Sequence, residues 1–310
     1  MSVLLFIVGF YGCCVLMGCC GEFEWLRRVL VRVAGEVAGF LRDRFGVEEY
    51  LVVETLHGED YGMKADVEAE DLIVELLKSE GLSGWVIGEE RGVVKIRGGG
   101  NLYFVVDPLD GSKNYAVGVP WCAVSIAALV NGEGRVPSLG DVVAGAIAPI
   151  FGGPILSFAR GVGVFEGGAL VHVRREPPAK MLLTYVEAPE QARLLRTYLE
   201  MAGRRSVRSL GSASLEIAWA ALGRVEAFID LRGKLRPVDV AAAVGLAVEL
   251  GAYVAVTRAF EPVTKVRRVG YVAVTAFDHA WNLIRKTMTS YGLEDPVEHL
   301  ITCRRAGDPV

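Results

Sequence analysis

One six-residue segment, DPLDGS at 107–112, holds the densest group of reactive side chains in the sequence. Pro108 fixes its own φ and favours a turn, so the carboxylates of Asp107 and Asp110 can converge on one side of a strand end. Carboxylates this close repel each other, and a hard cation such as Mg²⁺ relieves the repulsion by binding them with carbonyl oxygen and water. The Leu109 carbonyl lies between the two acids. The segment therefore predicts a Mg²⁺ site.

The two residues that close this segment suit the same chemistry. Gly111 and Ser112 can open a helical turn, and the free N–H groups at the start of a helix bind phosphate. A metal, a phosphate and the two acids would then share one place. The alternative is a plain turn, which is what most D-P-x-D-G stretches form.

Three further acids stand at the ends of expected elements. Glu89 follows a short apolar strand, and Asp66 and Asp239 each head an expected helix. Taken singly, the two aspartates fit helix N-caps and Glu89 fits a solvated loop acid. Together with the DPLDGS segment, they favour a shared acidic site.

Hydrophobic periodicity predicts the elements that position these acids. Helices are expected at 22–45, 66–81, 189–202, 212–222 and 239–250. Strands are expected at 85–88, 102–106, 121–130, 141–150, 154–159, 181–186, 206–209, 225–231 and 252–256. A turn-rich polar loop is expected over 54–65. The first half predicts an antiparallel or mixed sheet, and the second half alternates as α/β units do.

This pattern divides the chain into three parts. Residues 22–178 form an N-terminal α+β half with the metal site, and residues 179–310 form a C-terminal α/β half. An apolar extension, 1–21, precedes them. Its uncharged run of 18 residues is just short of the roughly 20 that span a bilayer. Three interpretations of this extension are open. Translation starts at Met17 and the residues before it are read in error, residues 1–20 anchor the protein in a membrane, or the run forms a buried helix.

Composition narrows the class of protein. With 33 Lys and Arg against 37 Asp and Glu, spread along the chain, nothing indicates nucleic-acid binding. Only two of the six Cys lie outside the extension, which is typical of a cytoplasmic protein; membrane anchoring is the alternative. Gln occurs once and Asn four times, and scarcity of these heat-labile residues favours a thermophile source.

Four motifs resemble, in order and spacing, the inositol monophosphatase and fructose-1,6-bisphosphatase superfamily. They are KADVEAE at 64–70, IGEE at 87–90, DPLDGS at 107–112 and VDVAA at 238–242. The resemblance covers nearly all of residues 22–290. Its local form, with GED at 58–60 and DLRGKLR at 230–236, looks most like the archaeal inositol-1-phosphatase branch.

The resemblance implies a layered α-β-α-β-α sandwich that hydrolyses phosphate monoesters with two or three Mg²⁺ ions. It also implies a homodimer and inhibition by Li⁺. By matching positions, the metal ligands would be Glu89, Asp107, the Leu109 carbonyl, Asp110 and Asp239. Glu89 also belongs to the implied catalytic set.

The same resemblance implies roles beyond metal ligation. Asp66 would hold a third ion through water and pair with Ser112 to take a proton from the attacking water. The Gly111 and Ser112 amides would hold the phosphate. Substrate hydroxyls would meet five residues, namely Asp110, Gly211, Ser212, Ala213 and Asp239.

Some positions depart from the family pattern. Met63 and Ala65 stand where many members carry Thr. Lys113 at its position is similar to the residue found in the adenosine 3',5'-bisphosphate phosphatases of the superfamily. Asn114 and Tyr115, by contrast, resemble the residues of the inositol branch.

A basic cluster precedes Asp239. Its members are Arg232, Lys234 and Arg236, and Arg232 is the candidate partner for a second phosphate on a sugar bisphosphate. A solvated loop is the alternative.

We therefore predict a Mg²⁺-dependent phosphatase for a small sugar or inositol phosphate. Inositol 1-phosphate is the expected substrate and fructose 1,6-bisphosphate a second. The alternatives are an adenosine 3',5'-bisphosphate 3'-phosphatase and a non-catalytic protein that binds a phosphorylated ligand.

Overall fold

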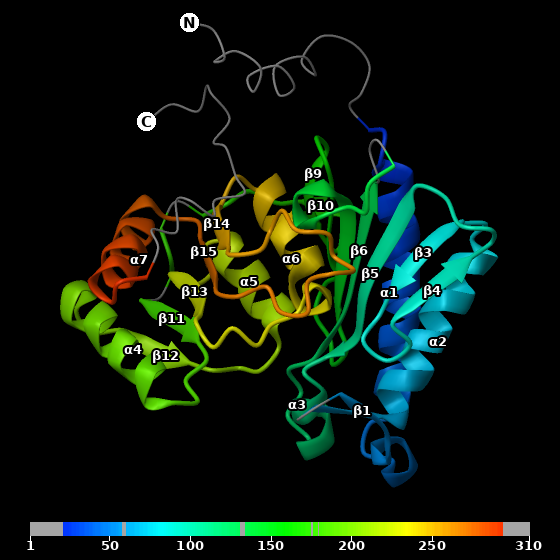
Figure 1. Ribbon diagram of the computed structural model, residues 1–310, viewed down its shortest axis with the longest axis horizontal. Coiled ribbons are helices and arrows are strands. Elements are labelled where there is room, and N and C mark those ends of the chain that lie inside the picture. Colours follow the sequence, from blue (N-terminus) through cyan, green and yellow to red (C-terminus); the bar gives the residue numbers. More distant parts are fainter. Residues whose placement is uncertain (1–20, 58–59, 131–133, 175, 179, 294–310) are drawn as a thin grey trace, which may run out of the picture.

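The computed structural model describes residues 21–57, 60–130, 134–174, 176–178 and 180–293 (Figure 1). The predicted extension therefore lies outside the described residues, except for Gly21. Among the described residues, no helix is both long and apolar enough to cross a membrane.

The described residues form seven α-helices and fifteen strands. The α-helices are α1 Glu24–Asp43, α2 Lys64–Ser79, α3 Ser112–Val117, α4 Pro189–Ala202, α5 Ala213–Ala221, α6 Pro237–Glu249 and α7 Asp278–Ser290. The strands are β1 Val53–His57, β2 Asp60–Met63, β3 Gly84–Ile87, β4 Val93–Ile96, β5 Leu102–Asp110, β6 Ala123–Val130, β7 Val142–Pro149, β8 Leu156–Ala159, β9 Gly163–Glu166, β10 Ala169–Leu170, β11 Met181–Thr184, β12 Ser206–Arg208, β13 Ala227–Asp230, β14 Tyr253–Val256 and β15 Val272–Thr275. Two 3₁₀ helices cover Glu48–Leu51 and Leu139–Asp141.

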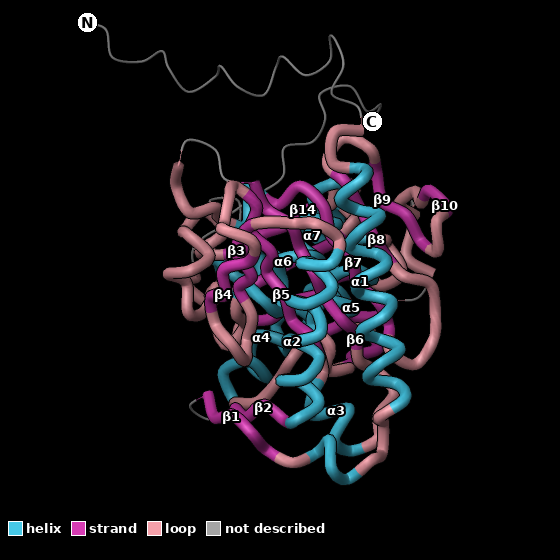
Figure 2. Tube along the Cα trace, turned by 90° about the vertical axis from the view of Figure 1, so that its right-hand side faces the viewer, coloured by secondary structure: helices cyan, strands magenta, loops and turns pink. Residues whose placement is uncertain are grey.

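Five layers stack across the molecule (Figures 1 and 2). Helices α1 and α2 cover one face of an eight-stranded sheet, and α6 packs on its other face together with α5. These two helices also pack on a five-stranded sheet, whose outer face carries α7 and its neighbour α4. The predicted layered α-β-α-β-α sandwich is confirmed.

Both large sheets are mixed. The eight-stranded sheet has the order β10-β9-β8-β7-β6-β5-β3-β4 and is antiparallel except where β3 runs parallel to β5. The five-stranded sheet has the order β12-β11-β13-β15-β14, with β11 parallel to both of its neighbours. The parallel β3–β5 pair brings the carboxyl ends of both strands to one edge, where the predicted acids lie.

The distribution of apolar residues around a helix depends on the layer in which the helix lies. Helix α1 has solvent on one side and buries a single stripe that includes Leu26, Leu30, Val33 and Val37. Helix α6 lies between two sheets, so residues 237–247 are all buried. A helix enclosed in this way is apolar all round. A charged residue on its first turn, Asp239, therefore needs a partner or a function.

Several features of the chain differ from expectation. Strands β4, β9 and β10 were not predicted. The predicted loop over 54–65 was wrong, because β1 and β2 pair there as an antiparallel hairpin. Helix α7 and strand β15 lie beyond the last predicted element. Strand β5 continues through Pro108, and this extension shapes the site.

Candidate active site

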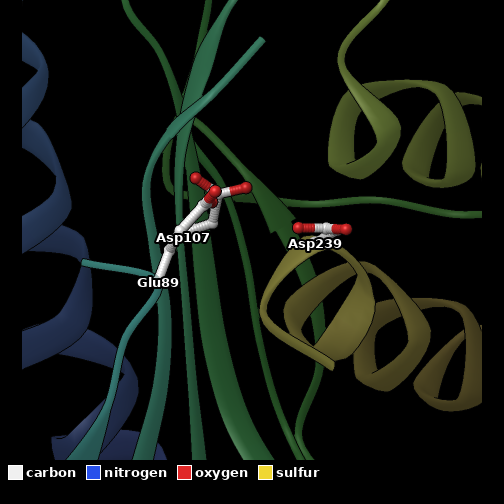
Figure 3. A group of neighbouring side chains, drawn as sticks. All are labelled: Glu89, Asp107 and Asp239. Carbon is white, nitrogen blue, oxygen red and sulfur yellow. The ribbon is translucent and has the colours of Figure 1, made fainter. Parts of the chain in front are cut away.

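Three carboxylates from separate elements meet at the edge of the eight-stranded sheet. Glu89 lies just after β3, Asp107 lies in β5 and Asp239 lies in the first turn of α6. One oxygen from each carboxylate lies within 4.8 Å of the others. Figure 3 shows Glu89 and Asp107 together at the strand ends, facing Asp239 across the gap.

A bulge in β5 sets the direction of the acids in the DPLDGS segment. Asp107 pairs with Ser125 and Asp110 with Ala123, so one extra residue lies between these pairs on β5. Pro108 has no N–H and cannot complete the ladder, which is why the irregularity falls here. The Leu109 N–H turns inward and donates to Asp107 Oδ1 at 3.1 Å.

Burial and mutual repulsion make this carboxylate cluster costly without a cation. Burial, then the charges of Asp110, Glu89 and Asp239, raise the pKa of Asp107 well above its ordinary value. Burial also raises the pKa of Glu89 to about 7, against the lowering effect of Arg236. Such closely spaced carboxylate oxygens are the ligands that hard divalent cations prefer. The residues present thus fit a divalent metal.

An arginine from the predicted basic cluster reaches into this group. Arg236 Nη2 lies 2.6 Å from Glu89 Oε2 and 3.1 Å from Asp239 Oδ1. Its backbone N–H also donates to Asp239 Oδ2 at 2.7 Å, which caps α6. The sequence analysis did not place Arg236 in the site. Its position three residues before Asp239, at the N-cap of α6, was the available signal.

We expect Arg236→Gln to have opposite effects with and without metal. Without metal, Glu89 and Asp239 lose their ion pairs with Arg236, so the free energy of unfolding should fall by about 1–3 kcal/mol. With the competing cation removed, Mg²⁺ should bind more tightly. Denaturant unfolding at several Mg²⁺ concentrations measures both effects. Weaker Mg²⁺ binding in the variant would contradict this account.

Asp66 and Ser112 lie together beside the carboxylate cluster. Ser112 Oγ lies 2.7 Å from Asp66 Oδ1 and 2.8 Å from the Leu109 carbonyl oxygen, so its single proton has two acceptors within reach. Asp66 also accepts the Met63 N–H at 2.9 Å, which caps α2. Met63 contributes through its backbone N–H, so this contact does not depend on the side chain at position 63. Burial raises the pKa of Asp66 to about 7.

Asp110 is held by hydrogen bonds from the start of α5. Its oxygens accept the Ser212 hydroxyl at 2.6 Å, the Ala213 N–H at 3.0 Å and the Ser214 N–H at 2.8 Å. The Ser214 hydroxyl also donates to it. Burial raises the pKa of Asp110 to about 6, although these hydrogen bonds oppose the rise. Two donors expected to meet substrate, on Ser212 and Ala213, are thus already bonded to Asp110.

Two buried glutamates that the sequence analysis did not single out hold the loops around the site. Glu70 accepts the Glu90 N–H at 2.7 Å and the Arg91 N–H at 3.0 Å, so it fixes the turn that presents Glu89. Its spacing of four residues from Asp66, on the same side of α2, was a usable signal. Glu216 accepts the Leu210 and Gly211 N–H groups, both at 3.1 Å, and the Tyr185 hydroxyl.

Most of the predicted site residues line one cleft of about 400 Å³. Its walls include the three clustered carboxylates, the Leu109-to-Ser112 turn, Gly211, Ala213 and Arg232. Ser212 is fully buried and does not line it. At Gly111, with φ of 101°, an added Cβ would lie 3.0 Å from the Trp121 carbonyl, so the turn that faces the cleft requires glycine.

Arg232, the predicted partner for a second phosphate, is already paired. Its Nε and Nη2 donate to the two oxygens of Asp230, each at 2.9 Å. Its Nη1 donates to Glu187, which also binds Lys234 at 2.6 Å. The guanidinium lies over the Tyr185 ring, 4.1 Å from its centre. Two carboxylates therefore neutralise these two cations.

The sequence matches a known family over most of its length. The model of the inositol monophosphatase family covers residues 23–286. The inositol-1-monophosphatase of Aeropyrum pernix is 40% identical over 270 residues, which are 84% of this chain and 95% of the relative. A fructose-1,6-bisphosphatase/inositol-1-monophosphatase of Methanothermobacter thermautotrophicus is 31% identical over 240 residues, which are 75% of this chain and 85% of the relative.

Solved structures agree with the fold. The extragenic suppressor protein suhB of Bartonella henselae has a TM-score of 0.69 at 24% identity, covering 85% of this chain and 98% of its own. A Pyrococcus horikoshii protein with similarities to inositol-1 monophosphatase has a TM-score of 0.66 at 26% identity, covering 85% and 98%.

Proposed function

This chain belongs to the inositol monophosphatase family, and from that membership we propose that it is a Mg²⁺-dependent inositol-1-phosphate phosphatase. The relatives named inositol-1-monophosphatase support hydrolysis of a phosphoric monoester. The observation that carries the proposal is the cluster of three carboxylates in the cleft, since a site for a neutral ligand would have no need of it.

The metal ligands we propose are Glu89, Asp107, Asp239, the Leu109 carbonyl and Asp110, for two or three Mg²⁺ ions. Bound Mg²⁺ supplies Lewis acidity, which acidifies water and neutralises phosphoryl oxygens. Asp110 differs from the others because its carboxylate also accepts the donors at the start of α5. It would thereby link metal binding to the position of the α5 loop. We propose that Gly211 and Ala213, which line the cleft, lie near substrate hydroxyls, whereas buried Ser212 holds Asp110.

The protein groups around the phosphate have separable tasks. The backbone N–H groups of Gly111 and Ser112, at the start of α3, would bind the phosphate and orient it for attack. Ser112 Oγ takes a proton from the attacking water while its own proton passes to Asp66 Oδ1, 2.7 Å away. The phosphoryl group is then transferred directly to the attacking oxygen while its bond to the substrate oxygen breaks, and the alcohol leaves with a proton from solvent water. No phosphorylated side chain is formed.

Fructose 1,6-bisphosphate is the second substrate we propose. Relatives from Methanothermobacter thermautotrophicus and Thermococcus kodakarensis are named fructose-1,6-bisphosphatase/inositol-1-monophosphatase, at 31% and 30% identity.

A panel of substrates tests the proposed function. The full-length chain, with saturating Mg²⁺ and at ambient and elevated temperature, is given inositol 1-phosphate, fructose 1,6-bisphosphate and adenosine 3',5'-bisphosphate. Phosphate release should be fastest from the first or the second. Release only from the third would reassign the enzyme as a nucleotide 3'-phosphatase. No release from any of them, with the compounds still bound, would identify a binding protein.

We also propose that the chain acts in the cytoplasm of a thermophile as a homodimer. The metal site expected in the 22–178 half draws on both halves, because Asp239 of α6 joins Glu89 and Asp107. The scarcity of Gln and Asn supports heat adaptation. Light scattering on purified full-length protein should give twice the monomer mass of 33.5 kDa, and the monomer mass would contradict this.

A further inference from the structure

Two adjacent arginines near the cleft have no carboxylate partner within the part of the chain that the structure describes. Arg267 and Arg268 lie in the loop between β14 and β15, and both are exposed. Among the described residues, neither has a salt bridge or side-chain hydrogen bond. Nearby, by contrast, Arg232 binds Asp230 and Glu187, and Lys234 binds Glu187. Like charges this close repel each other, so an anion between them would be favoured.

The loop that carries these arginines is fixed against the catalytic cleft. Val266 and Val269, on either side of the pair, are buried, so both arginines are directed outward. The Val269 N–H donates to the Leu235 carbonyl at 2.8 Å, and Leu235 lines the cleft. The backbone therefore holds the arginine pair beside residues 234–236.

A positively charged hollow joins this pair to the catalytic site. It measures about 360 Å³, and Glu89 and Arg236 line both it and the cleft. The other charged residues lining it are Lys234, Arg267 and Arg268. A second hollow of about 510 Å³ continues from the pair and is lined by Gly233, Arg258, Arg267, Arg268 and Gly270. Among these lining residues the only carboxylate is Glu89, which is bonded to Arg236.

We propose that this hollow binds the second phosphate of a bisphosphate substrate while the first phosphate lies in the catalytic cleft. The guanidinium groups of Arg267 and Arg268 would be its principal contacts, because two planar forks match the oxygens of a phosphate. Arg232 would not fill this role, since its donors already meet Asp230 and Glu187. The inference rests on the proposed phosphatase function and adds the feature that would select bisphosphates over monophosphates.

Steady-state kinetics of Arg267→Gln/Arg268→Gln test this inference. For fructose 1,6-bisphosphate, KM should rise by about tenfold or more with kcat nearly unchanged, because a contact kept from ground state to transition state affects binding alone. For inositol 1-phosphate, which has no second phosphate, kcat/KM should stay within about twofold. Adenosine 3',5'-bisphosphate, assayed in parallel, shows whether the hollow also accepts a nucleotide phosphate.

Two control variants separate direct contact from general charge. Arg193→Gln/Arg196→Gln removes the same net charge from exposed positions on α4 and should leave the kinetics for all the substrates unchanged. Arg267→Lys/Arg268→Lys keeps the charge without the planar fork and should recover only part of the lost affinity.

The inference and the proposed function fail in different ways. Equal bisphosphate kinetics for wild type and the Gln variant, or wild-type cleavage of inositol 1-phosphate but of neither bisphosphate, would overturn the inference alone. If the wild type cleaves nothing, the proposed function fails. The affinity of wild type and of Arg267→Gln/Arg268→Gln for fructose 1,6-bisphosphate, measured by calorimetry, then tests the inference separately. Weaker binding by the variant supports the inference, and equal binding or no binding overturns it.

Discussion

Asp107→Asn should lower Mg²⁺-dependent turnover by about a thousandfold or more. Loss of a group that merely supports a metal ligand costs about 10–100-fold, and loss of a central ligand should cost more. Asp107 is 4% exposed and lies with Glu89 and Asp239 in the carboxylate cluster, so its loss removes one of three grouped ligands. Asn keeps the shape and can still accept the Leu109 N–H.

The same substitution should stabilise the metal-free protein. Asp107 is buried among carboxylates that repel it, and a neutral amide removes that repulsion. The melting temperature without metal should therefore rise, while the increase on adding Mg²⁺ should disappear. Asp71→Asn is the matched control, because Asp71 is an exposed acid on α2 paired with Arg91; it should leave turnover unchanged. A variant that melts lower than wild type without metal but keeps its turnover would show that Asp107 is structural.

Asp66→Asn should reduce kcat by about 10²–10⁴-fold with little change in KM. Asn can still accept the Met63 N–H and cap α2, so the helix should remain intact. It cannot accept a proton from Ser112 Oγ, and its amide would instead donate to that oxygen. Steady-state kinetics at saturating Mg²⁺ measure the effect, with circular dichroism to confirm that the fold is retained.

Substitutions at Ser112 provide the test that a structural role for Asp66 would fail. Ser112→Thr retains the hydroxyl and should keep most activity, whereas Ser112→Ala should lose kcat to an extent similar to Asp66→Asn. Because the two groups act as a pair, the double variant Asp66→Asn/Ser112→Ala should be little worse than either single one. Fully multiplicative losses would contradict a shared proton path.

The sequence alone predicted which acids form the site, because each lies where a strand or helix ends. Glu89 follows β3, Asp107 lies near the end of β5, and Asp239 begins an apolar helix. Helices α1, α2, α4, α5 and α6 and most strands followed from hydrophobic runs and periodicity, whereas α7 was not predicted. Helix α4 was predicted with the bounds that the structure shows, Pro189–Ala202.

The directions of the side chains could not be predicted from spacing. Asp107 and Asp110 are three residues apart, and this spacing did not indicate that Asp110 accepts hydrogen bonds from the start of α5, about a hundred residues further along the chain. Pairing of Arg236 with Glu89 likewise depends on how α6 docks against β3. Both facts arise from long-range packing, which local patterns do not encode.

Release of phosphate from inositol 1-phosphate, titrated with Mg²⁺ after complete chelation, tests the central claim most directly. The full-length wild type should release none in chelator and regain full turnover as Mg²⁺ is restored. Its melting temperature should rise over the same Mg²⁺ range, and Asp107→Asn should show neither change. Full turnover in chelator, or turnover that Asp107→Asn retains, would contradict a metal-dependent acidic site.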